Sequence, residues 1–308
     1  MIDALTTLLS SPMMQRSLLA ALIVGLTAPI IGTYLVHRRL AMLGDGIGHI
    51  SLTGVALGWL VGAFANVSPA DSWAIPGAVI ISLLGAITIE LVRQSGRTSG
   101  DTALAMLFYG GIAGGVLLIG LAGGTSAQLN SYLFGSISTV RWSDITLITI
   151  LGIAIVALGI GLAPALFSVT NDEDFARSTG LPVRTLSLLI AVLSALTVAV
   201  AMRVVGSLLV SALMVIPVAI AQLGARSFRS TMGIAMALGV VICMSGLSLT
   251  YFIDLSPGAT IVVGAIALYA IGFGIRAIVD RIRRVRRLRA ARGHNQHPER
   301  EHLAHADA

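Results

Sequence analysis

The chain alternates long apolar runs with short polar breaks along most of its length. Each run is about as long as a helix that crosses a bilayer, which takes about 20 apolar residues. The pattern predicts an all-α integral membrane protein, a polytopic bundle of about nine transmembrane helices. The predicted spans are Leu18–Val36, Met42–Phe64, Trp73–Val92, Ala103–Ala122, Ile145–Val169, Thr185–Met202, Val204–Gly224, Thr231–Ile253 and Ala259–Ile275.

Two segments leave the number of transmembrane helices open between eight and nine. The sixth and seventh runs are separated only by Arg203, which predicts a tight hairpin with an arginine that extends to the membrane surface. The segment Gly123–Asp144 predicts a loop, but its stretch LNSYLFGSIS also has the composition of a segment that re-enters the membrane. Eight spans therefore remain an alternative to nine.

The positions of the arginines predict the orientation. With the N-terminus outside, 17 of the 20 basic residues fall on the cytoplasmic side, and only Arg16, Arg141 and Arg203 fall outside. Cytoplasmic loops of membrane proteins carry such an excess. We therefore expect a multi-pass protein of the cell membrane with a cytoplasmic C-terminus. The first residues lack a positively charged n-region, so no cleavable signal peptide is expected.

Composition supports a lipid environment and excludes several chemistries. The 308 residues are 56% hydrophobic and only 11% charged, whereas soluble domains carry about a quarter charged residues. The chain contains no lysine, which excludes a Walker A ATPase site within it. The single Cys243 excludes an intrachain disulfide and a CxxC site. The basic residues gather in a tail and do not indicate nucleic-acid binding.

The stretch MLGDGIGHIS places Asp45 and His49 four residues apart at the start of the second predicted span. Residues at this spacing share one face of a helix. A carboxylate and an imidazole together suit zinc, manganese or ferrous iron. Ionisable side chains at membrane depth usually line a pathway. The pair is therefore a candidate metal contact in an ion pathway.

Structural roles compete with this interpretation. Asp45 is also a suitable N-cap for the second span, or an ion-pair partner for Arg38 or Arg39. His49 is equally compatible with hydrogen-bonded packing. Glu90 lies near Arg93 and Arg97 and is interpreted as a member of an interfacial ion pair.

The loop SVTNDEDFARSTGLPVRT predicts a short cytoplasmic helix between two spans. Asn171 or Asp172 provides the N-cap, and Gly180 provides the stop. The helix is either a simple capped connector or a docking helix for a cytoplasmic subunit. A chain with no ATPase motif of its own would need such a subunit for active transport.

The C-terminal region differs in composition from the rest. We expect residues 1–280 to form a transmembrane domain and residues 281–308 to form a disordered cytoplasmic tail rich in arginine and histidine. Histidine-rich tracts bind metals weakly, although such tails are more often solvated and inert. The tail histidines are His294, His297, His302 and His305.

Four motifs in the same order resemble one known family. They are HRRLAMLGDGIGHISLTGVALG, SYLFGSI, VGSLLVSALMVIPVAIA and DLSPGATIVV. They resemble the permease subunits of ATP-driven importers for zinc, manganese and iron, the ABC-3 family. The resemblance covers roughly Leu18 to Ile275. One departure concerns the fourth span, LAMLFYGGIAGG, which lacks a histidine that some relatives carry and so leaves zinc and manganese both open.

The resemblance implies a function and a set of partners. Two permease copies form the pathway, a separate cytoplasmic ATP-binding subunit hydrolyses ATP, and an extracytoplasmic solute-binding protein delivers the metal. The chain itself is then not an enzyme, and its metal ion is transported cargo. The implied metal contacts are Asp45 and His49, and the implied coupling helix spans about Asp172 to Gly180, with matching positions at Phe175, Ala176 and Gly180.

Three other classes of protein remain as alternatives. A gradient-driven metal-ion transporter or channel would need no ATPase, but it normally has more ionisable residues within its spans than this chain. A membrane scaffold would use the acidic loop only for recruitment. An intramembrane metalloprotease is disfavoured because the sequence contains no HExxH motif.

Overall fold

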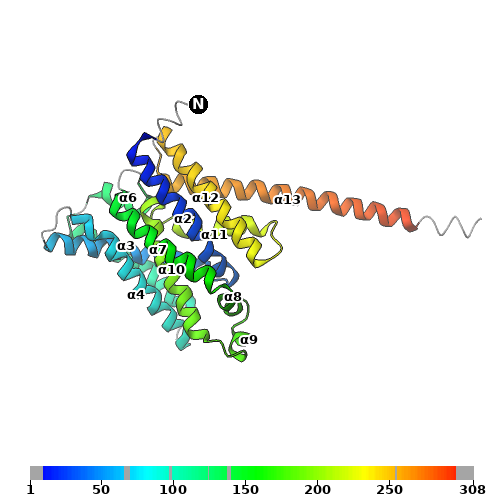
Figure 1. Ribbon diagram of the computed structural model, residues 1–308, viewed down its shortest axis with the longest axis horizontal. Helices are drawn as coiled ribbons and strands as arrows, with labels where there is room; N and C mark the ends of the chain where they lie inside the picture. Colours follow the sequence, from blue (N-terminus) through cyan, green and yellow to red (C-terminus); the bar gives the residue numbers. More distant parts are fainter. Residues whose placement is uncertain are drawn as a thin grey trace, which may run out of the picture.

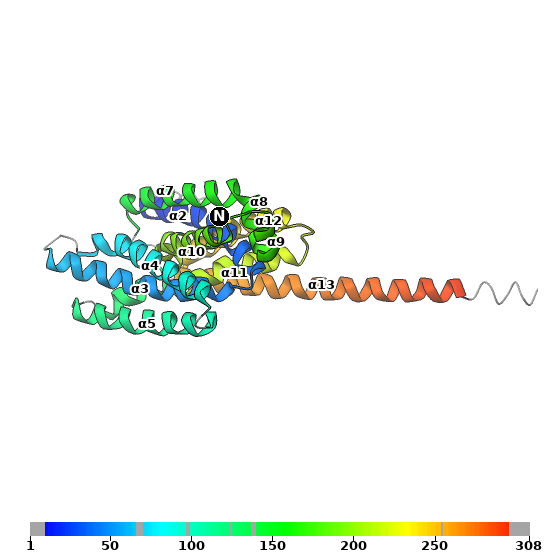
Figure 2. The same cartoon turned by 90° about the horizontal axis from the view of Figure 1, so that it is seen from below.

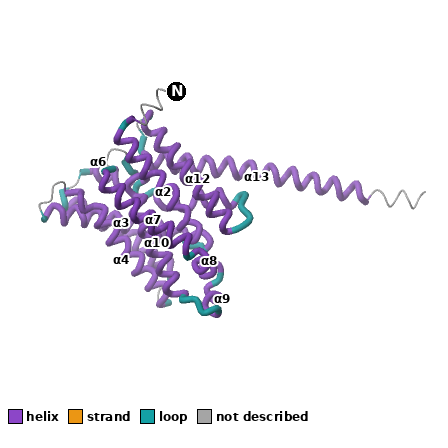
Figure 3. Tube along the Cα trace, viewed as in Figure 1, coloured by secondary structure: helices purple, strands orange, loops and turns teal. Residues whose placement is uncertain are grey.

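The computed structural model describes residues 10–65, 70–96, 99–123, 125–136, 140–253 and 255–295. Within these ranges the chain forms helices joined by short turns, and it forms no β-strand, which confirms the predicted all-α fold (Figure 1, Figure 3). Many large apolar side chains remain exposed on the outer surface of the bundle. This surface suits a bundle surrounded by lipid.

Within the described residues, eight helices are long and apolar enough to cross a membrane. They are α2 (Pro12–His37), α3 (Ala41–Phe64), α4 (Ala74–Ser95), α5 (Gly100–Leu121), α7 (Trp142–Gly161), α10 (Val183–Val205), α12 (Phe228–Phe252) and α13 (Pro257–Asn295, apolar to Arg283). The shorter helices are η1 (Ala70–Trp73), α6 (Ser126–Phe134), α8 (Ala163–Asn171), α9 (Glu173–Ser178) and α11 (Val210–Gln222). The lower of the two predicted numbers of long spans is therefore correct for the described residues.

The difference from nine spans arises after α10. Gly206 ends this helix with a φ of +89°, a left-handed conformation that favours glycine, and α11 follows with only 13 residues. A helix of that length reaches about 20 Å, less than the roughly 30 Å of a hydrocarbon core. The fifth predicted span is also divided, because α7 ends at Gly161 and a new helix, α8, begins at Ala163 with Pro164 in its first turn.

The stretch LNSYLFGSIS, which the sequence predicts as part of a loop or as a segment that re-enters the membrane, contains the end of α6 and packs against this interruption. The backbone carbonyl of Tyr132 in α6 accepts a hydrogen bond from the Ser207 amide at 2.9 Å. The prediction that Arg203 extends to the membrane surface is wrong. Arg203 is 4% exposed, its Nε lies 3.4 Å from Asp144 Oδ2, and its guanidinium lies over the Tyr132 ring. A nearby carboxylate and an aromatic face hold the cation inside.

Contacts between helices define two ends of the bundle. At one, which we call the α9 end, Phe228 packs on the rings of His37 and Phe167, and Glu173 of α9 pairs with Arg93. At the other, which we call the far end, Arg16 lies over the Trp142 ring and Arg203 pairs with Asp144. The arginines that the structure describes divide between the ends as the sequence predicts, whereas Arg97 and Arg300 lie outside the described residues.

Glycines allow α3 and α4 to pack closely. A Cβ added to Gly54 would lie 2.5 Å from the Gly77 carbonyl oxygen, and one added to Gly77 would overlap the backbone of α3 in return. On the opposite side of α3, a Cβ on Gly111 of α5 would lie 2.6 Å from the His49 carbonyl carbon. The helices α3, α4 and α5 therefore form a closely packed group, which lies together in both views (Figure 2).

The last helix continues beyond the bundle (Figure 1, Figure 2). The helical backbone of α13 extends to Asn295, so His294 lies in its final turn. His297, His302 and His305 lie outside the described residues. A separate tail after residue 280 and metal binding by its histidines both stay predictions.

Candidate functional site

The polar turn identified in the sequence lies inside α3. This helix begins at Ala41 with Leu40 at the N-cap position, so Asp45 is the fifth helical residue and the capping role is wrong. Its Oδ1 lies 3.8 Å from His49 Nε2. The other competing role also fails for Arg38, which pairs with Glu173. The helix thus places the carboxylate and the imidazole side by side on one face.

The two side chains differ in environment. The His49 side chain is 4% exposed, and its ring meets the Phe108 ring edge-on with centroids 4.1 Å apart. Its Nδ1 is buried and has no hydrogen-bond partner in the part of the chain that is described. The Asp45 side chain is 24% exposed and accepts a hydrogen bond from Ser211. A buried donor or acceptor without a partner is unfavourable, so it calls for a functional explanation.

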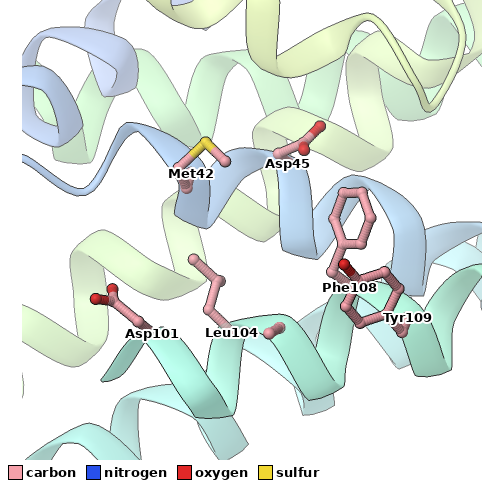
Figure 4. Close-up of a pocket in the computed structure, with 7 residues that line it drawn as sticks. Met42, Asp45, Asp101, Leu104, Phe108 and Tyr109 are labelled. Atoms are coloured by element: carbon pink, nitrogen blue, oxygen red, sulfur yellow. The ribbon is translucent and has the colours of Figure 1, made fainter. Parts of the chain in front are cut away.

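A cavity of about 430 Å³ opens beside Asp45 (Figure 4). The first turns of α3 and α5 line it, and Figure 4 shows Asp45 on one side and Asp101 with Tyr109 on the other. Its remaining lining is apolar, apart from these carboxylates and the phenol. The arrangement offers a cation an approach to Asp45 through largely apolar surroundings.

Glycines of α3 also bring its polar turn close to the neighbouring helices. A Cβ on Gly48 would lie 2.7 Å from the Ser207 carbonyl oxygen, so only glycine allows the chain between α10 and α11 to approach here. On Gly44, a Cβ would contact Ser211 at 3.7 Å. The close approach therefore depends on Gly48, and it places Ser207 and Ser211 of a distant segment against the polar turn.

The donor set suits a divalent cation only in part. Ligands at about 2.0–2.2 Å in a tetrahedral shell lie roughly 3.4 Å apart, which is close to the Asp45–His49 separation of 3.8 Å. No cluster of three or more histidine, cysteine, aspartate or glutamate residues occurs among the described residues. Ser211 adds a hydroxyl oxygen beside the pair, and the sequence does not indicate it, because 166 positions separate it from Asp45.

The second candidate site is α9, the helix predicted between two spans. The Asp172 side chain accepts hydrogen bonds from the amides of Asp174 and Phe175, which confirms it as the N-cap. Gly180 ends the turn with a φ of +82°. Ala176 is fully buried whereas Phe175 is 61% exposed, so the helix anchors by one face and presents an aromatic ring on the other.

A charged network that the sequence did not indicate joins α9 to the spans. Glu173 pairs with Arg38, which follows α2, and its Oε1 lies 3.6 Å from Arg93 of α4. Arg38 also donates to Ser187 at 3.0 Å. Burial, and next the charge of Arg93, lowers the pKa of Arg38 to about 10, so it remains charged at neutral pH. Glu173 thus links α9 to two helices of the bundle.

Comparison with known families gives a match over nearly all of the bundle. The ABC 3 transport family matches residues 10–276, which include seven of the eight long helices of the described chain in full and α13 as far as Arg276. This chain belongs to the ABC 3 transport family. The membership confirms the predicted family and the predicted role as a membrane permease of an ABC transport system, and it disfavours the gradient-driven alternative.

Individual proteins that resemble this chain are also membrane components of metal transport systems. The chain is 32% identical over 266 residues to the manganese transport system membrane protein MntC of Halalkalibacterium halodurans, covering 86% of this chain and 88% of that protein. It is 29% identical to the high-affinity zinc uptake system membrane protein ZnuB of Haemophilus influenzae, covering 83% of this chain and 94% of that protein. A solved structure of PsaBC from Streptococcus pneumoniae in complex with a Fab superposes with a TM-score of 0.78 at 30% identity, covering 89% and 95%.

Proposed function

We propose that this permease imports divalent metal ions, manganese or zinc, and that Asp45 and His49 contact the ion on its way through the membrane. The observation that carries the proposal is the acid–imidazole pair on α3, which lies beside a cavity in a bundle with few other ionisable groups. Relatives named for manganese and for zinc support the same class of cargo.

ATP hydrolysis is assigned to a separate cytoplasmic subunit, because the chain has no lysine for a phosphate-binding loop. That subunit docks at α9, where Phe175 is exposed beside the buried Ala176. The arginines concentrated at the α9 end make it the cytoplasmic end, which puts the N-terminus outside. An extracytoplasmic binding protein then delivers the metal to the far end.

The transport cycle uses a second permease copy. The ion exchanges some of its water for the Asp45 carboxylate and the His49 imidazole, with further ligands from the partner copy. Rearrangement of the ATP-binding subunits moves α9, and the Glu173 network transmits the movement to α2 and α4. Few protein ligands keep the affinity low enough for release. Protonated His49 cannot bind a metal, so uptake should fall in acid.

Uptake into cells that lack their own importer tests this function. Cells that express the permease with its ATP-binding subunit and binding protein should accumulate manganese or zinc, and Asp45→Asn should abolish accumulation while the protein stays in the membrane. The matched control is Asp280→Asn, a half-exposed carboxylate on α13 next to Arg276. Normal uptake by the Asp45 variant would refute the site, and failure to co-purify an ATPase would refute the mechanism.

A further inference from the structure

The interruption between α10 and α11 lies directly against the polar turn of α3. The Ser207 carbonyl lies over Gly48, and Ser211, one helical turn later, lies against Gly44. The two segments therefore run antiparallel, and positions 207 and 211 both belong to the side of this segment that approaches α3. Interrupted helices position ion sites in several transporter folds.

The Ser211 hydroxyl makes a direct contact with one of the two proposed ion ligands, Asp45. Its Oγ donates a hydrogen bond of 3.1 Å to Asp45 Oδ1, the same oxygen that lies 3.8 Å from His49 Nε2. In an octahedral shell with bonds of about 2.2 Å, neighbouring oxygens lie roughly 3.1 Å apart. One cation can therefore contact Ser211 and Asp45 together without a large movement of either side chain.

A second hydroxyl lies deeper on the same segment. Ser207 is 1% exposed, and its Oγ has no hydrogen-bond partner among the described residues, like the Nδ1 of His49. Two unsatisfied buried polar groups on facing segments are unfavourable unless a ligand or water satisfies them. Their location on either side of the contact between α3 and the α10–α11 interruption indicates that something polar passes here.

We propose that Ser211 is a third contact of the transported cation, contributed by α11, and that it favours manganese over zinc. The assignment rests on the proposed function and extends it to cargo choice. A carboxylate and a neutral hydroxyl are hard oxygen donors, which suit Mn²⁺, whereas one imidazole alone gives Zn²⁺ less advantage than a site with several nitrogens or thiolates. Ser211 thereby sets selectivity as well as affinity.

The test measures both metals in one sample. The permease is reconstituted in vesicles with its ATP-binding subunit and binding protein, and uptake of Mn²⁺ and Zn²⁺ is followed in competition. We expect Ser211→Ala to raise the KM for Mn²⁺ about tenfold, and Ser211→Thr to restore it because the hydroxyl remains. Ser211→Cys should shift the Zn²⁺ to Mn²⁺ uptake ratio about tenfold toward zinc, because a thiolate is a softer ligand.

A matched serine serves as the control. Ser248 lies on α12, half-buried, with its hydroxyl bonded at 2.7 Å to the Met244 carbonyl of its own helix. Ser248→Cys should leave the uptake ratio unchanged. The ratio does not depend on how much variant protein folds, so an unchanged ratio in Ser211→Cys together with an unchanged KM in Ser211→Ala would overturn the assignment. A wild-type protein that transports neither metal would instead overturn the proposed function.

Discussion

Charged groups at the α9 end and polar groups in α3 lie in the same bundle but in contrasting environments. Glu90, 3% exposed, accepts hydrogen bonds from Arg93 and Gln94, and Glu173 joins Arg38 to Arg93. In α3, by contrast, the Nδ1 of His49 has no partner in the described chain, and Asp45 faces a cavity. Glu90 and His49 are both buried, but only Glu90 has hydrogen-bond partners for its polar side-chain atoms that face away from solvent; the Nδ1 of His49 has none among the described residues.

This difference separates structural from functional polar residues in a membrane bundle. A buried charge with complete partners contributes to the fold, and removing one partner leaves the other uncompensated. A buried group without partners contributes little to stability, so its presence in lipid-surrounded structure needs another cause. The contrast predicts that replacing the unpartnered His49 affects transport, and that breaking a buried ion pair affects stability.

The largest effect is expected at His49. His49→Leu replaces an unpartnered imidazole by an apolar side chain, so metal uptake should be lost, by about 100-fold or more, while the free energy of unfolding stays within about 1 kcal/mol. Uptake and thermal unfolding of the purified protein measure the two quantities. A His49→Leu protein that is much less stable than the wild type would show that His49 is needed for the fold. The proposed difference between His49 and the paired charges would then be wrong.

The next effect is expected at the far end. Asp144→Asn leaves Arg203, which is 4% exposed, without its carboxylate, and should lower the free energy of unfolding by about 3–5 kcal/mol. Changing Arg203 to Met in the same chain should recover much of that loss. Thermal unfolding of Asp144→Asn, of Arg203→Met and of the double variant gives the interaction free energy of the pair. If the two single losses of stability simply add in the double variant, the pair does not interact.

A smaller loss should follow Gly48→Ala. The added Cβ would lie 2.7 Å from the Ser207 carbonyl, so the backbones must separate, at about 1–3 kcal/mol. Gly110→Ala on α5 is the matched control, because no atom lies within 4 Å of its Cβ position. If both alanines are equally tolerated in thermal unfolding, the close contact between α3 and the α10–α11 interruption does not exist.

The smallest effect is expected at Glu173, which is 39% exposed. Glu173→Gln should change stability by about 1 kcal/mol or less, because exposed ion pairs contribute little. It should nevertheless reduce the uptake obtained per ATP hydrolysed, since it weakens the link from α9 to α2 and α4. Asp174→Asn, on the same helix but exposed and paired with its neighbour Arg177, is the control and should leave that ratio unchanged.

Local patterns predicted much of this architecture. Apolar runs identified the long helices, a capping residue and a glycine bounded α9, and the four-residue spacing placed Asp45 beside His49. Glu90 does pair with Arg93, as its position suggested. These features depend on residues close together in the sequence, where helix geometry alone fixes the distances.

Features that depend on distant segments were missed. The apolar content of residues 204–224 indicates that the segment is buried. It does not indicate how long the helix within it is, so the sequence does not reveal the interruption at Gly206. Arg203 was expected at the surface because Asp144 and Tyr132 are far away in the sequence. Ser211 and Glu173 were likewise absent from the predicted site, since a single serine or glutamate gives no signal without its partner.

The glycine contacts between α3 and its neighbours limit how the ion pathway can open. Neither Gly54 against Gly77 nor Gly111 against the His49 backbone leaves room for one helix to slide along the other. If the pathway opens by movement of α3, we therefore expect α4 and α5 to move with it as one unit. A spectroscopic probe on the outer surface of α4, remote from any cation, would therefore report the movement of Asp45.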